Sequence, residues 1–282
     1  MSDFEPLRCL RADPTGGLRP ACVTLVGAGP GDAELLTVKA VRALAAARLV
    51  LYDHLVSKDV LGFVPREAEL VYVGKEAAHH TLPQRDIIEL MLHLARSGRP
   101  VVRLKGGDPY IFGRGGEEAQ ALAAAGVPFE VIPGISAAQG AAASAGIPLT
   151  HRDHAASVRF VAGHLRDGAA DAIDLDWPSL AAPRQTLVVY MGVAALPVIC
   201  AQLIQHGLDP ATPAAVIERA TLPDERVLTG TVLGLPTLAL EQRVRAPALI
   251  VIGSVVSLRA ELSAAAASAT RPGARPLHAV AA

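Results

Sequence analysis

Short apolar runs alternate with helical patterns along the first half of the chain. The helical patterns are clearest at Pro83–Arg96 and Glu117–Ala125. Continuous apolar strands separated by helices are typical of a parallel sheet that is covered on both faces. The pattern therefore predicts an α/β domain with a parallel sheet. Its expected strands are residues 23–27, 48–52, 69–74, 101–106 and 129–134.

Apolar runs that are typical of strands recur in the second half of the chain: "SVRFVAG", "TLVVYMG", "AAVIERA", "RVLTGTV" and "ALIVIG". Only "TLPDE" separates the third run from the fourth, which leaves no room for a helix and predicts a hairpin in a mixed sheet. We therefore expect two α/β domains, at residues 22–134 and 135–262. The turn-rich and low-complexity ends, residues 1–21 and 263–282, are expected to be mobile tails.

The composition supports a globular chain, because 51% of its 282 residues are hydrophobic. No apolar run approaches the roughly 20 residues that a membrane helix needs. The first residues include acids and lack a continuous apolar segment, so we expect no secretory signal, no membrane partner and a cytoplasmic location.

The charge of −1 gives the molecule no overall field that would attract nucleic acid, so an anionic ligand must meet a local cluster of cations. The three cysteines form no CxxC pair, and adjacent histidines such as His79 and His80 seldom share one metal ion. We expect neither a nucleic-acid partner nor a metal.

The stretch "VGAGPGD" follows the first strand, where a parallel sheet presents its carboxyl edge to ligands. Gly27 and Gly29 match a dinucleotide fingerprint, but Asp32 replaces its third glycine and Pro30 removes a backbone donor. Asp53 stands where such enzymes keep a ribose-binding acid. Asp is also well suited to cap a helix, and a polar group at the cleft edge that handles a substrate proton is a third alternative. A plain tight turn and a nicotinamide-dependent oxidoreductase therefore stay open as alternatives.

The stretch "VRLKGGDPYIFGRGGEE" follows the fourth strand. Gly106 and Gly107 let the backbone approach a ligand closely, and Asp108 can accept hydrogen bonds from hydroxyl or ammonium groups. Asp32, Asp53 and Asp108 each follow a different strand, so three strand exits carry an acid. An edge with these acids suits a ligand that has a positive centre and hydroxyl groups.

Charged residues further along this stretch have separate explanations. Glu117 and Glu118 complement the dipole of the helix that they begin. Arg114 is unfavourable beside a helix N-terminus, so we expect it to face an anion. Lys75, after the third strand, is either solvated or a polar group at the same sheet edge.

Several motifs in this order and spacing resemble the tetrapyrrole methylase family: "VGAGPGD", "YDHLVS", "VGK", "VVRLKGGDPYIFGRGGEE", "VIPGISAAQGAAASAGIPLTHR" and "VVYMGV". The resemblance covers Val23–Leu262 and is greatest to the members that methylate uroporphyrinogen III. It implies two α/β domains with the active site in the cleft between them, a homodimer, and S-adenosyl-methionine as methyl donor. It also implies methyl transfer to C2 and C7, which gives precorrin-2.

Carried over by position, the resemblance implies a proton acceptor at Asp53 and a proton donor at Lys75. Arg114 and Glu117 match further residues on the tetrapyrrole side, and Arg152 matches a substrate-binding position. Arginines suit this acceptor because acetate and propionate groups surround it. The implied donor contacts are Pro30, Gly106, Gly107, Asp108, Ile111, Ser136, Ala137, Met191 and Ala220.

The sequence departs from the family pattern after Lys75, where Glu76, Ala77 and Ala78 replace the usual Arg-x-Gly. We expect this change to affect substrate contact. Ser136 stands where threonine is common and keeps the hydroxyl. No fused dehydrogenase and ferrochelatase unit is recognised, so siroheme would need separate enzymes. A methylase for a later precorrin and a non-enzymatic sensor remain alternatives.

Overall fold

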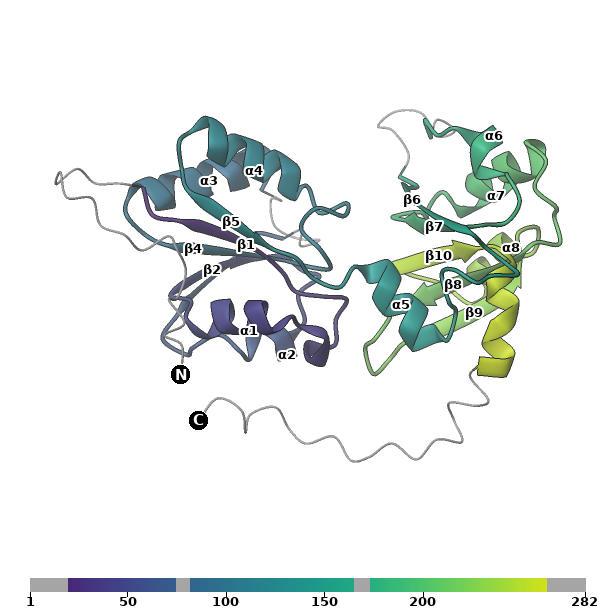
Figure 1. Cartoon of the computed structure of the whole chain (residues 1–282), viewed down its shortest axis with the longest axis horizontal. Helices are drawn as coiled ribbons and strands as arrows, with labels where there is room; N and C mark the ends of the chain where they lie inside the picture. The colour runs from purple at the N-terminus through teal and green to yellow at the C-terminus, as the bar shows by residue number, and fades with distance from the viewer. Residues whose placement is uncertain (1–19, 75–81, 165–172, 263–282) are drawn as a thin grey trace. The chain divides into compact units, whose positions relative to one another are not determined.

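The computed structural model describes residues 20–74, 82–164 and 173–262 (Figure 1). The chain divides between Ser136 and Ala137 into two compact units. The predicted domain boundary after residue 134 lies close to this division. Apart from residues 20 and 21, the predicted tails lie outside the described residues.

The first unit contains a five-stranded sheet in the order β3-β2-β4-β1-β5, and all its neighbouring strands are parallel, as predicted. β1 and β4 lie inside the sheet and are buried at every position, because both their faces are covered. The strands are β1 (Val23–Gly27), β2 (Leu49–Tyr52), β3 (Glu69–Tyr72), β4 (Val101–Lys105) and β5 (Phe129–Ile132).

Helices cover both faces of this sheet (Figure 1). On one face, Leu25 and Leu51 pack with Met91 of α3 (Gln84–Arg96) and with residues of α4 (Gly115–Ala124). The other face packs against α1 (Val38–Ala45) and α2 (Lys58–Leu61). The short η1 (Ala33–Leu35) follows β1. Because successive side chains of a strand point to opposite faces, Val101, Arg103 and Lys105 of β4 all lie on the face covered by α3 and α4.

The second unit contains a mixed five-stranded sheet in the order β6-β7-β10-β8-β9. β6 is parallel to β7, whereas β10 is antiparallel to both β7 and β8. β8 and β9 form the predicted antiparallel hairpin. The strands are β6 (Ser157–Ala162), β7 (Gln185–Tyr190), β8 (Pro213–Glu218), β9 (Arg226–Thr231) and β10 (Ala248–Ile252).

One face of this sheet forms an apolar core with α6 (Trp177–Leu180), α7 (Leu196–Gln205) and α8 (Leu235–Glu241). On the opposite face, α5 (Ala137–Ala145) packs on β10 and η2 (Ser254–Leu258) packs on β8. Within the described part of the chain, no helix has the length and apolar character needed to cross a bilayer.

Candidate active site

The exits of β1, β4 and β5 are joined at the carboxyl edge of the first sheet. Gly107 N donates to Gly29 O over 2.7 Å, and Gly29 N donates to Gly107 O over 3.1 Å. A Cβ atom on Gly27 would overlap Gly134 N, and one on Gly134 would lie 2.9 Å from the Cα atom of Gly27. These loops therefore pack backbone against backbone, which only glycine permits.

The Asp108 carboxylate holds two of these loops together. Its Oδ1 accepts a hydrogen bond from Tyr110 N at 2.8 Å, and its Oδ2 accepts one from Gly134 N at 3.0 Å. Each carboxylate oxygen has a second lone pair, so these bonds leave acceptor capacity for a ligand. Asp108 therefore fixes the loop after β4 to the exit of β5.

The loops after β1 and β4 carry most of the predicted donor residues of the first unit. Pro30, Gly106 and Ile111 lie there, partly buried. Because β1 and β4 are parallel neighbours, the structure brings these residues to one edge of the sheet. Ser136, the last residue of the first unit, is buried.

Asp53 follows β2 at the same sheet edge. Its Oδ1 accepts from Leu55 N at 3.1 Å, and its Oδ2 lies 3.6 Å from the Arg103 guanidinium. Asp53 is not the cap of the following helix, because Ser57 caps α2. Its predicted partner in proton transfer, Lys75, lies outside the described residues, as does the altered segment 76–78.

Arg114 and Glu117 form a bidentate ion pair, with distances of 2.9 Å from Nε to Oε1 and 2.7 Å from NH2 to Oε2. Arg114 was expected to face an anion, and in the structure that anion is Glu117. The hydrogen bond raises the pKa of Arg114 and lowers the pKa of Glu117. About half of each side chain is exposed to solvent.

Glu118 has a role that the helix-dipole interpretation missed. Its side chain is fully buried, and Oε1 lies 2.9 Å from Lys105 Nζ and 3.3 Å from Arg103 Nε. Burial, and then the nearby Arg103 cation, lower the pKa of Lys105. The alternation of Arg103 and Lys105 with apolar residues in a buried strand is the sequence signal that could have revealed an internal counter-ion.

The second unit places Met191 directly after β7 and Ala220 two residues after the end of β8. Both strands are antiparallel to β10, so they run in the same direction and end at the same edge. The backbone there is left-handed at Met191 (φ 57°), Arg219 (φ 45°) and Thr221 (φ 70°). Such non-glycine conformations cost roughly 1–3 kcal/mol each and cluster at ligand sites.

Tyr190 connects the end of β7 to the start of α5. Its hydroxyl accepts a hydrogen bond from Ala138 N at 3.0 Å, next to the predicted donor residue Ala137. Arg152 lies in the loop between α5 and β6 with an exposed side chain, and its carbonyl accepts from the Arg184 guanidinium.

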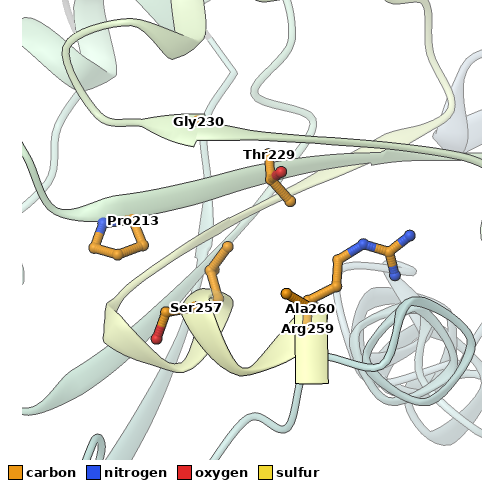
Figure 2. A pocket seen from close by; sticks show the side chains of 7 residues that line it. Pro213, Thr229, Gly230, Ser257, Arg259 and Ala260 are labelled. Atoms are coloured by element: carbon orange, nitrogen blue, oxygen red, sulfur yellow. The ribbon is translucent and has the colours of Figure 1, made fainter. Parts of the chain in front are cut away.

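An open pocket of about 330 Å³ lies elsewhere on the second unit (Figure 2). It lies beside Pro213, at the opposite end of β8 from Ala220, and Thr229, Ser257 and Arg259 contribute to its lining. None of the predicted site residues lines it, so we assign it no part in the candidate site.

Comparison with known proteins gives similarity along most of the chain. Siroheme synthase of Pseudomonas fluorescens (strain Pf0-1) is 57% identical over 241 residues, which is 86% of this chain and 51% of that protein. Siroheme synthase of Azotobacter vinelandii is 54% identical over 93% of this chain and 56% of that protein. The chain thus spans about half the length of these curated relatives.

Solved structures give a similar result. Uroporphyrin-III C-methyl transferase from Thermus thermophilus, complexed with S-adenyl homocysteine, is 43% identical with a TM-score of 0.72, over 84% of this chain and 100% of that chain. A cobalt precorrin-4 methyltransferase is 30% identical with a TM-score of 0.73, over 85% of this chain and 99% of that chain. Residues 22–236 match the family of Tetrapyrrole (Corrin/Porphyrin) Methylases, and the chain belongs to this family.

Proposed function

We propose that the chain catalyses the S-adenosyl-methionine-dependent C-methylation of uroporphyrinogen III at C2 and C7 to give precorrin-2. The observation that carries the proposal is the 43% identity, over the whole of that chain, to a uroporphyrin-III C-methyl transferase complexed with S-adenyl homocysteine. A methylase for another precorrin is the second candidate, because a cobalt precorrin-4 methyltransferase is 30% identical. The nicotinamide-dependent oxidoreductase is not favoured, since the family match covers residues 22–236.

The carboxyl edge of the first sheet suits the methyl donor. When bound, S-adenosyl-methionine supplies an electrophilic methyl group next to a sulfonium cation. The glycine exits of β1 and β4 leave room for close backbone contact, and the Asp108 carboxylate keeps acceptor capacity for an ammonium or hydroxyl group. On the second unit, the exposed Met191 offers an apolar surface for the adenine.

The remaining predicted residues serve the acceptor. Arg114 and Arg152 would bind carboxylates of the porphyrinogen, and Arg114 would then exchange Glu117 for a substrate carboxylate. Asp53 would accept the proton that the methylated pyrrole releases, and Lys75 would act as the proton donor. The loops of the sheet edge are joined by backbone hydrogen bonds, so little reorganisation is needed at the moment of transfer.

The proposal includes a homodimer and a cytoplasmic location. Leu233 and Leu240 of the second unit are 66% and 80% exposed, which supports a surface that a partner subunit covers. Light scattering of the purified chain gives its mass in solution, and the mass of a single chain would contradict the dimer.

An anaerobic assay with uroporphyrinogen III and S-adenosyl-methionine tests the proposed activity. We expect two methyl groups per tetrapyrrole, counted by mass spectrometry of the oxidised product. If uroporphyrinogen III is not methylated but a later precorrin is, the second candidate replaces the first. Calorimetry that detects NAD binding without S-adenosyl-methionine binding would favour the oxidoreductase instead.

A further inference from the structure

Glu118 is the centre of a buried charge network in the first unit. Its Oε1 accepts hydrogen bonds from Lys105 Nζ at 2.9 Å, Arg103 Nε at 3.3 Å and Gln84 Nε2 at 3.1 Å. Its Oε2 is also buried, and no residue that the structure describes donates a hydrogen bond to it. The network joins β4, α3 and the first turn of α4.

Arg103 extends this network to Asp53. One edge of its guanidinium faces Glu118, and NH2 lies 3.6 Å from Asp53 Oδ2. NH1 donates to Leu104 O at 3.1 Å, which fixes the plane of the group against the sheet. Arg103 is therefore held between a buried carboxylate and the carboxylate predicted to accept the proton.

Lys105 lies beside the turn that carries two further predicted catalytic residues, Arg114 and Glu117. Its Cε lies under the loop after β4, where a Cβ atom on Gly113 would be 3.4 Å away. Arg114 comes directly after Gly113, and Glu117 comes directly before Glu118. The Lys105–Glu118 pair therefore lies next to the turn that carries the Arg114–Glu117 pair.

Stability alone does not account for this arrangement. Replacing a buried ion network by well-packed apolar residues is often neutral or stabilising. Burial is the main cause that lowers the pKa of Lys105, and the nearby Arg103 cation lowers it further. Oε2 of Glu118, to which no described residue donates a hydrogen bond, adds a further desolvation cost. This network reaches the predicted proton acceptor Asp53 through Arg103, and it lies against the turn that carries Arg114 and Glu117.

We propose that Glu118 is a positioning residue for methyl transfer. Through Arg103 it holds Asp53 in place, and through Lys105 it fixes the first turn of α4, which presents Arg114 and Glu117. This inference rests on the proposed function, because the roles of Asp53 and Arg114 are part of that proposal.

Two variants test the inference. Glu118→Asp keeps the charge but shortens the side chain by one methylene, so it preserves folding while it loosens the network. The double variant Glu118→Gln with Lys105→Met removes both charges of the pair, and we expect it to unfold at a urea concentration close to that of the wild type. Glu130→Gln, which removes an exposed ion pair with Lys39 in the same unit, is the matched control.

We expect kcat for uroporphyrinogen III to fall about 10- to 100-fold in both variants, since small misplacements of reacting groups have effects of this size. The dissociation constant for S-adenosyl-homocysteine should stay within about twofold of the wild type, because the loop contacts of Asp108 do not involve Glu118. The control should keep both values.

Wild-type kcat in either variant would overturn the inference, and so would a loss of S-adenosyl-homocysteine binding that parallels the loss of kcat. A double variant that fails to fold would leave Glu118→Asp to decide. A wild-type chain that methylates no porphyrinogen would instead contradict the proposed function itself.

Discussion

Asp108 shows how one side chain can organise the candidate donor site. Both of its carboxylate oxygens accept backbone hydrogen bonds, from Tyr110 N and Gly134 N. In Asp108→Asn, one of these donors would face an amide NH2 group instead. We expect the free energy of unfolding to fall by about 1–3 kcal/mol and S-adenosyl-homocysteine to bind at least about tenfold more weakly. Urea denaturation and calorimetry measure the two effects.

Asp209 provides a matched control for this prediction. Its Oδ1 accepts from Ala211 N at 2.8 Å, the same local turn that Asp108 makes with Tyr110. An asparagine oxygen can keep that single bond, so Asp209→Asn should change the stability by less than about 0.5 kcal/mol. Equal effects of the two substitutions would show that the bond to Gly134 contributes little.

The Arg114–Glu117 pair predicts a dependence of stability on pH. The pair lowers the pKa of Glu117 below its ordinary value of 4.5. Its contribution is therefore present above pH 4.5 and is lost as the pH falls through the lowered pKa. Because both side chains are half exposed, we expect no more than about 1 kcal/mol.

Urea denaturation of the wild type and of Glu117→Gln, measured from neutral pH to below pH 4.5, tests this dependence. The wild type should be the more stable protein at neutral pH, and the difference should shrink as Glu117 becomes protonated. A difference that stays constant with pH would exclude the pair as its source.

At the scale of elements, the close packing of strand exits predicts opposite effects for two glycines. A Cβ atom on Gly134 would meet the backbone of Gly107 and Gly27, so Gly134→Ala should destabilise the first unit by about 1–3 kcal/mol. A Cβ atom on Gly116, in the first turn of α4, would meet no described atom within 4 Å apart from its chain neighbours and the backbone of its own helix, so Gly116→Ala should stabilise by about 0.5–1 kcal/mol. Urea denaturation compares the two, and a Gly134→Ala chain as stable as the wild type would contradict the packing argument.

The sheets could be predicted because their signals are local. Continuous apolar runs predicted the parallel strands of the first unit, and the short connection "TLPDE" predicted the hairpin of β8 and β9. The topology rule for parallel sheets also predicted that Asp53 and Asp108 share one edge. Their strands β2 and β4 are neighbours in the structure, so this expectation is confirmed.

The buried network could not be predicted in the same way. Glu117 and Glu118 are identical neighbours in the sequence, yet one is half exposed and the other fully buried. Which of them turns inward depends on the rotation of α4 against β4, and this is a tertiary property. The hydrogen bond from Ala138 to Tyr190 is equally non-local, because 52 residues separate the two positions.

At the scale of the whole molecule, the charge of −1 gives no attraction for an acidic porphyrinogen over long distances. Any salt dependence of kcat/KM must therefore come from local cations such as Arg152. We expect Arg152→Met to lower kcat/KM for uroporphyrinogen III about tenfold at low salt and to flatten its decline with added salt. Arg85, 83% exposed on α3, supplies the control: Arg85→Met changes the net charge equally and should leave both quantities unaltered. Equal losses in the two variants would mean that net charge, and not a local contact at Arg152, governs the capture of substrate.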